Sequence, residues 1–135
     1  RLLSHGADIN ARCIDHYSTP LQYLATRTAD VGRFLIERGA EIDPISAVLV
    51  GEPSLVAEML EKAPQLLHAK VDATHFPSSP EYKTLNIFVF TVGFNASLLH
   101  AAAKANRSSM IDLLCRMGLS PDIRGGYDDA TPLHI

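Results

Sequence analysis

The sequence predicts an all-helical fold in which pairs of helices repeat along the chain. Within its 135 residues, Gly6-Ala7-Asp8 returns as Gly39-Ala40-Glu41, 33 positions later. Likewise, Ser97-Leu98-Leu99-His100 returns as Thr131-Pro132-Leu133-His134, 34 positions later. Between these segments, apolar residues follow the i, i+3, i+4 spacing that gathers them on one buried face of a helix. The pattern therefore predicts that each repeated unit contains helices, and that these bury their apolar faces against the neighbouring unit.

Composition favours a single globular domain and excludes several classes of protein. Hydrophobic residues make up 47% of the chain and charged residues 20%, which argues against a disordered protein. The 12 basic and 15 acidic residues are mixed along the chain, so we expect neither a nucleic-acid nor a membrane partner. Cys13 and Cys115 stand far apart, which indicates reduced thiols, and we expect a cytoplasmic monomer.

Several imperfect copies of one motif carry a family resemblance. Thr19-Pro20-Leu21-Gln22 is a third copy of the motif at 97–100 and 131–134, and small residues follow it. This set resembles the ankyrin repeat, which has a period of about 33 residues and the signature Thr-Pro-Leu-His. The resemblance implies an α-solenoid in which each unit is a short helix, a longer antiparallel helix and a β-hairpin finger. It covers nearly the whole chain and implies a protein-interaction module without cofactor or metal.

The chemistry of the repeated motif supports this interpretation independently. Thr19 is suited to cap a helix, and Pro20 is suited to its first position. Gly39 and Gly118 stand where the second helices should end, at a position that favours a left-handed residue. The resemblance also implies that His100 and His134 are structural residues that connect adjacent loops.

The spacing divides the chain into units of one domain, 1–135, which we expect to be a fragment of a longer array. Residues 1–12 resemble the tail of a repeat, and 125–135 the start of another. Complete units are expected at 13–43, 44–96 and 97–124. In the middle unit Pro44 follows Asp43 at once, so we expect a helix from Pro44 without a preceding finger, capped by Asp43. A second helix is expected from Pro53 to Glu61.

Residues 71–94 are longer than a repeat requires and form an insertion. The segment from Thr84 to Val92 is rich in residues that favour strands. We expect it to pair with residues 68–74 as an extended β-hairpin over about 68–94, projecting from the concave side. Such a hairpin has two interpretations: its aromatic residues bind a partner, or one face packs on the adjacent helices.

The resemblance implies that fingers and first helices line a concave surface that binds another protein. No phosphate-binding loop and no metal-ligand spacing is present in the sequence, so we do not expect an enzyme. One alternative is a regulatory or substrate-presenting segment of a larger enzyme. Another is a metal-dependent hydrolase with a zinc site at His68, Asp72 and His75. The expected partner-binding residues are polar or aromatic side chains on fingers, first helices and insertion: Arg12, Asp15, His16, Tyr17, Tyr23, Tyr82, Phe88, Phe90, Arg124, Tyr127 and Asp128.

Overall fold

The computed structural model of the chain describes residues 8–13, 15–25 and 27–125, and the regular secondary structure among them is almost entirely helical. Most of the repeat tail expected at 1–12 and most of the unit expected at 125–135 lie outside them. The expectation of an all-helical fold is confirmed for this part of the chain. Its seven α-helices and one 3₁₀ helix are α1 (Pro20–Ala25), α2 (Ala29–Glu37), α3 (Pro44–Val50), α4 (Pro53–Lys62), η2 (Pro64–His68), α5 (Ile87–Thr91), α6 (Leu98–Lys104) and α7 (Ser108–Arg116).

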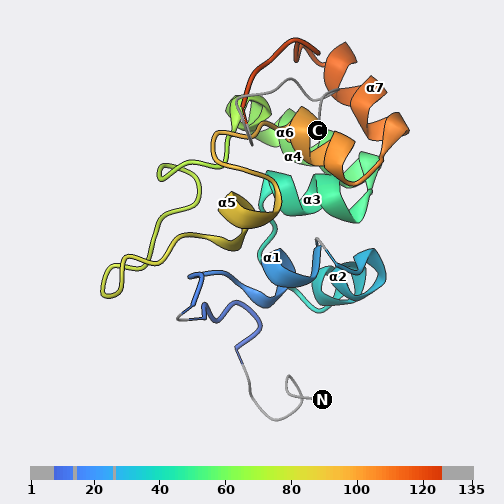
Figure 1. The fold of residues 1–135 in the computed structure, drawn as a ribbon. Helices are drawn as coiled ribbons and strands as arrows, with labels where there is room; N and C mark the ends of the chain where they lie inside the picture. The colour runs from blue at the N-terminus through green and yellow to red at the C-terminus, as the bar shows by residue number, and fades with distance from the viewer. Residues whose placement is uncertain (1–7, 14, 26, 126–135) are drawn as a thin grey trace.

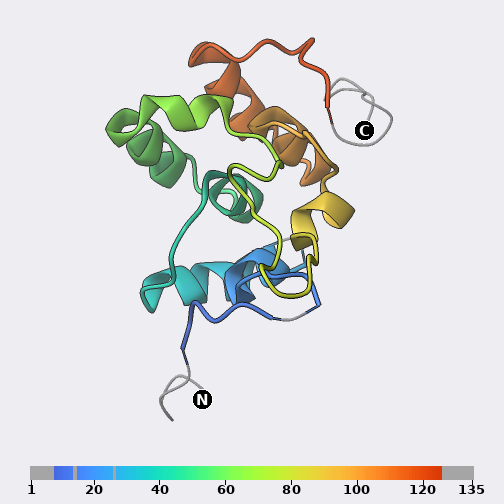
Figure 2. The ribbon, with the colours of Figure 1, turned by 90° about the vertical axis from the view of Figure 1, so that its left-hand side faces the viewer.

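Six of these helices pack as pairs that follow one another along the molecule (Figure 1). Helix α1 packs on α2, α3 on α4, and α6 on α7. The pairs also contact each other, because α3 touches α1, α2 and α6, and α4 touches α7. Figure 2 shows the first pair at one end, the α6–α7 pair at the other and α3 between them. No helix in the described residues is long and apolar enough to cross a membrane.

The hydrophobic core runs through the first helix of each pair. Every residue of α3 is buried, as expected for a helix with a neighbouring pair on both sides. Leu21 in α1 and Leu99 in α6 are also buried. Ala101 and Ala102 are completely buried as well, and their small side chains let α6 approach α3 closely.

The helix starts use the caps that the sequence predicts. The Thr19 hydroxyl accepts from the backbone N–H of Gln22 at 3.3 Å, and the Asp43 carboxylate accepts from that of Ser46 at 2.8 Å. At α6, Ser97 and His100 cap each other: His100 Nδ1 accepts from the Ser97 backbone at 3.1 Å. His100 is fully buried, which agrees with a structural role.

The second helices of the first and last pairs end in the same hydrogen-bonded turn. Gly39 and Gly118 have φ values of +92° and +119°, as the sequence predicts for left-handed residues after a helix. In each turn the residue after the glycine donates to a carbonyl of the last helical turn, Ala40 to Leu35 at 3.0 Å and Leu119 to Leu114 at 3.1 Å. Helix α4 ends differently, since η2 begins at once after Ala63.

The insertion corrects one prediction. Helix α5 occupies most of the segment expected to be a strand, so the extended hairpin over 68–94 is wrong. Phe88 and Val92 are buried while Phe90 between them is exposed, which fits a helix, because a strand would place all three side chains on one face. Tertiary burial thus outweighs the strand propensity of the segment. An isolated antiparallel bridge, between Lys70 and Ser97, lies at the base of the insertion.

Candidate functional site

The insertion folds back onto α1, and Asn86 is the residue that connects them. Asn86 is buried, its Nδ2 donates to Gln22 Oε1 at 3.0 Å, and its Oδ1 caps α5 by accepting from the Phe88 backbone at 2.9 Å. The Ile87 backbone donates to Ser18 Oγ at 2.9 Å. Gln22 in turn donates through Nε2 to Asp43 Oδ2 at 3.1 Å. Hydrogen bonds therefore join the insertion to α1, and α1 to the start of α3.

Phe88 lies in the core, not at the surface. Its side chain is fully buried and meets Phe76 edge to face, with ring centroids 5.3 Å apart. This contact joins the two ends of the insertion and belongs to the geometries that aromatic pairs prefer. The expectation that Phe88 contacts a partner is therefore wrong, and the packing interpretation of the insertion holds for this residue.

Three of the expected contact residues come together where α5 meets α1. The ring of His16 lies 5.1 Å from the ring of Phe90 and 5.9 Å from that of Tyr23. Phe90 remains 52% exposed, although it follows the buried Phe88 by only two residues. Helix α5 thus turns Phe88 into the core and leaves Phe90 at the surface.

A second group joins the segment before α1 to the outer loop of the insertion. The Arg12 guanidinium lies over the Tyr17 ring at 5.0 Å, and its Nη1 donates to the Tyr17 carbonyl at 2.9 Å. Arg12 and Tyr17 line a hollow of about 340 Å³ with Tyr82, which is 60% exposed. Three predicted contact residues thus meet, although Tyr82 stands far from the other two in the sequence.

Cys13 and Tyr23 lie between these two groups. Cys13 Sγ lies 3.1 Å from the Tyr23 hydroxyl oxygen. Burial and this hydrogen bond raise the pKa of Tyr23 to about 12. Burial opposes ionisation of the Cys13 thiol, but hydrogen bonds from Tyr23 and the nearby backbone outweigh it and lower the pKa of Cys13. The contact between Cys13 and Tyr23 positions the segment before α1 against the helix.

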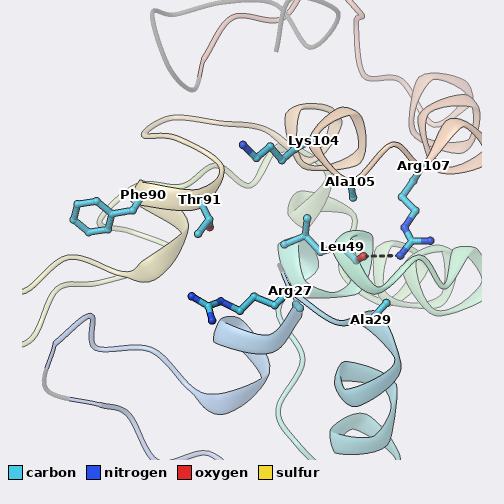
Figure 3. A pocket seen from close by; sticks show the side chains of 9 residues that line it. Arg27, Ala29, Leu49, Phe90, Thr91, Lys104, Ala105 and Arg107 are labelled. Carbon is cyan, nitrogen blue, oxygen red and sulfur yellow. Dashed lines mark hydrogen bonds between the residues drawn. The ribbon is translucent and has the colours of Figure 1, made fainter.

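A cleft lies beside α5, where the ends of α1, α3 and α6 come together (Figure 3). Its volume is about 480 Å³. Three basic residues line it, Arg27 from the turn after α1 and Lys104 and Arg107 from the end of α6 and the turn that follows. The remaining lining residues are apolar or small: Ala25, Ala29, Leu49, Phe90, Thr91 and Ala105.

Arg107 has a structural role in this cleft. Its Nη2 donates to the Leu49 carbonyl near the end of α3, at 3.3 Å. Gly51 leaves room for the guanidinium, because a Cβ at that position would lie 2.8 Å from Arg107 Cζ. Gly51 also has a φ of +77°, which a residue with a side chain adopts less readily. Arg107 therefore holds the turn after α6 against α3, whereas Arg27 and Lys104 are exposed.

The other expected site residues are not gathered into either group. Asp15 and Arg124 are exposed, while Tyr127 and Asp128 lie outside the described residues. His75 Nδ1 lies 2.9 Å from Asp72 Oδ1. Within the described part of the chain, however, no three His, Cys, Asp or Glu side chains gather as a metal site requires.

Sequence analysis missed the cleft and part of the exposed apolar surface. In or beside the turns between paired helices lie the three basic residues of the cleft, Arg27, Lys104 and Arg107. Basic residues at two such turns could have indicated a basic surface at the helix ends. Leu85 and Phe94, which are 49% and 56% exposed, lie in the segment that was interpreted as an extended β-hairpin.

The functional interpretation of this chain depends on the geometry of these surfaces. The described residues bring together an aromatic group at α1 and α5, a hollow between Arg12, Tyr17 and Tyr82, and a basic cleft at the helix ends. Neither the protein-family models nor the curated proteins with which the chain was compared give a match.

Proposed function

We propose that this chain is an ankyrin-repeat solenoid segment that binds another protein. The binding surface consists of the ends of α1 and α6 together with the insertion at 71–94. Three helix pairs in chain order, two of which end in the same glycine turn, support the repeat interpretation. In such a stack each pair buries its apolar face on the next, so one side of the array remains available for recognition.

The proposal rests mainly on the position of the exposed apolar side chains. Among the described residues, four of the six large hydrophobic side chains that are exposed belong to the insertion: Tyr82, Leu85, Phe90 and Phe94. Exposed apolar groups concentrated on one segment mark interaction sites more often than scattered ones do. Aromatic residues also contribute strongly to protein interfaces because they bury a large area.

The insertion is suited to binding because it is held in place before a partner arrives. Phe88 and Asn86 hold α5 from below, so Phe90 is presented on a short helix instead of a free loop. Fixing a contact residue before binding lowers the entropy that association must overcome. The same two residues explain how a 24-residue segment, 71–94, remains ordered beside the helix pairs.

The proposal is tested by comparing two double variants as baits for a partner protein. Phe90→Ser with Phe94→Ser removes two exposed rings from the insertion. Val31→Ser with Phe34→Ser is the matched control, because these side chains are also exposed but belong to α2. A partner recovered by the parent chain is purified, and its affinity for each variant is measured by titration calorimetry.

We expect the insertion variant to bind at least tenfold more weakly, since truncating an interface aromatic residue costs about 1–2 kcal/mol or more. The α2 variant should bind as the parent does. Circular dichroism and urea unfolding must show that both variants remain folded. Equal loss in the two variants, or loss in the α2 variant alone, contradicts the proposed surface.

A further inference from the structure

We propose that the cleft beside α5 binds an acidic peptide segment of the partner protein, with Arg27 and Lys104 receiving its carboxylates. This inference rests on the proposed function, because it names the chemistry that one part of the binding surface recognises. It concerns the cleft at the ends of α1, α3 and α6, which is separate from the hollow between Arg12, Tyr17 and Tyr82.

The lining of the cleft is positively charged. Among the described residues that line the cleft, three are basic and none is acidic. The chain as a whole carries a net charge of −3, so this concentration of positive charge does not follow from composition. Like charges gathered in a cleft raise the local potential and attract a ligand of opposite sign. An anionic ligand is therefore the complement of this surface.

Among the described residues, no carboxylate forms an ion pair with Arg27 or Lys104. Arg33 pairs with Asp30 and Glu52 on the first two helix pairs, and Lys62 pairs with Glu58 within α4. Arg107 is engaged by the Leu49 carbonyl, which leaves the other two to meet a ligand.

The cleft places one cation on each of two sides, with apolar side chains between them. In Figure 3, Lys104 and Arg27 extend toward α5 from opposite sides of the cleft, with Leu49 between their helices. The lining between the two cations is apolar, and Phe90 and Thr91 form the side that α5 contributes. This surface suits a peptide that places an apolar side chain between acidic ones.

A peptide fits this surface better than a nucleic acid does. Single-stranded nucleic acids bind in extended basic grooves where several aromatic side chains stack on successive bases. Here the basic lining is confined to three residues, and Phe90 is the only aromatic residue among the described residues that line the cleft. The mixed surface charge outside it gives a polyanion no continuous path.

The test is a peptide-display selection with the folded chain as the immobilised target. Parent protein, Arg27→Glu with Lys104→Glu, and a control with Lys62→Glu and Arg116→Glu are each screened against one random library. The control changes net charge by the same amount at two basic residues that do not line the cleft. Arg107 stays unchanged because its hydrogen bond supports the fold. A further target, Tyr17→Ala with Tyr82→Ala, probes the other hollow.

We expect the parent to enrich peptides with more Asp and Glu than the unselected library, with apolar residues between them. For a synthetic copy of one such peptide, the cleft variant should bind at least about tenfold more weakly and the control within about twofold, since reversing two charges changes attraction to repulsion. Parent binding should weaken as salt concentration rises.

The outcomes separate this inference from the proposed function. Enriched peptides without acidic residues, retained by the cleft variant but lost with Tyr17→Ala and Tyr82→Ala, overturn the acidic-peptide inference and leave a protein-binding module. Failure to enrich any peptide overturns both. If a 20-nucleotide single-stranded DNA binds the parent more tightly than the selected peptide does, the cleft belongs to a nucleic acid and the inference is wrong.

Discussion

Replacing Asn86 by Ala should loosen the insertion and measurably destabilise the chain. The substitution removes the cap of α5, which contributes about 1 kcal/mol, and the hydrogen bond to Gln22, which contributes about 1 kcal/mol more. The expected loss in the free energy of unfolding is therefore about 2 kcal/mol. Asn86→Ser is the matched variant, because serine also caps a helix but is too short to replace the amide that reaches Gln22. It should lose only about 1 kcal/mol.

Urea unfolding followed by circular dichroism measures both losses, and hydrogen exchange locates them. The Val92 amide donates to the Phe88 carbonyl within the docked insertion, so its exchange should quicken by about thirtyfold in Asn86→Ala. The reasoning is refuted if both variants unfold with the parent. It is also refuted if the Ala variant loses stability while exchange at Val92 is unchanged, because the insertion would then be held by other contacts.

Three other substitutions test separate parts of the fold. Phe88→Ala should lower the free energy of unfolding by about 3–5 kcal/mol, since it empties a fully buried aromatic site; a loss below about 1 kcal/mol in urea unfolding would mean that the ring is not in the core. Gly118→Ala should cost about 1 kcal/mol because φ there is +119°, and thermal unfolding that matches the parent would contradict the turn. Burial raises the pKa of Asp43 in the folded chain, so its contribution to stability is fully present below the unfolded value of about 3.9 and is lost as pH rises through the folded pKa. Asparagine does not titrate, so the free energy of unfolding of Asp43→Asn should rise relative to that of the parent as pH rises from about 4 to 7. Urea unfolding at several pH values measures this difference, and a difference that does not change with pH would refute the pKa shift.

The parts of the fold that sequence predicts well are those set by neighbouring residues. Thr19 and Asp43 cap helices because the side chain of each accepts a hydrogen bond from the backbone N–H three residues later. Gly39 and Gly118 end helices because only a local backbone angle is required there. Caps and glycine turns are short-range features, so one sequence suffices to locate them.

The insertion was mispredicted because a distant contact decides its structure. Its Val, Ile and Phe residues suit a strand, but a docked helix buries Phe88 and Val92 and leaves Phe90 exposed between them. Asn86 starts that helix and bonds to Gln22, 64 residues away, a pairing that no local pattern reveals. The cleft was missed for the same reason, since Arg27 and Lys104 meet only when the first and last helix pairs are stacked.

Hydrogen exchange on the parent chain, with and without its purified partner, tests most directly whether one face of the stacked helices binds protein. We predict slower exchange in the bound state over 77–94 and at the ends of α1 and α6, with α2, α4 and α7 unchanged. Protection confined to α2, α4 and α7 would place the partner on the opposite side of the helix pairs and contradict the account.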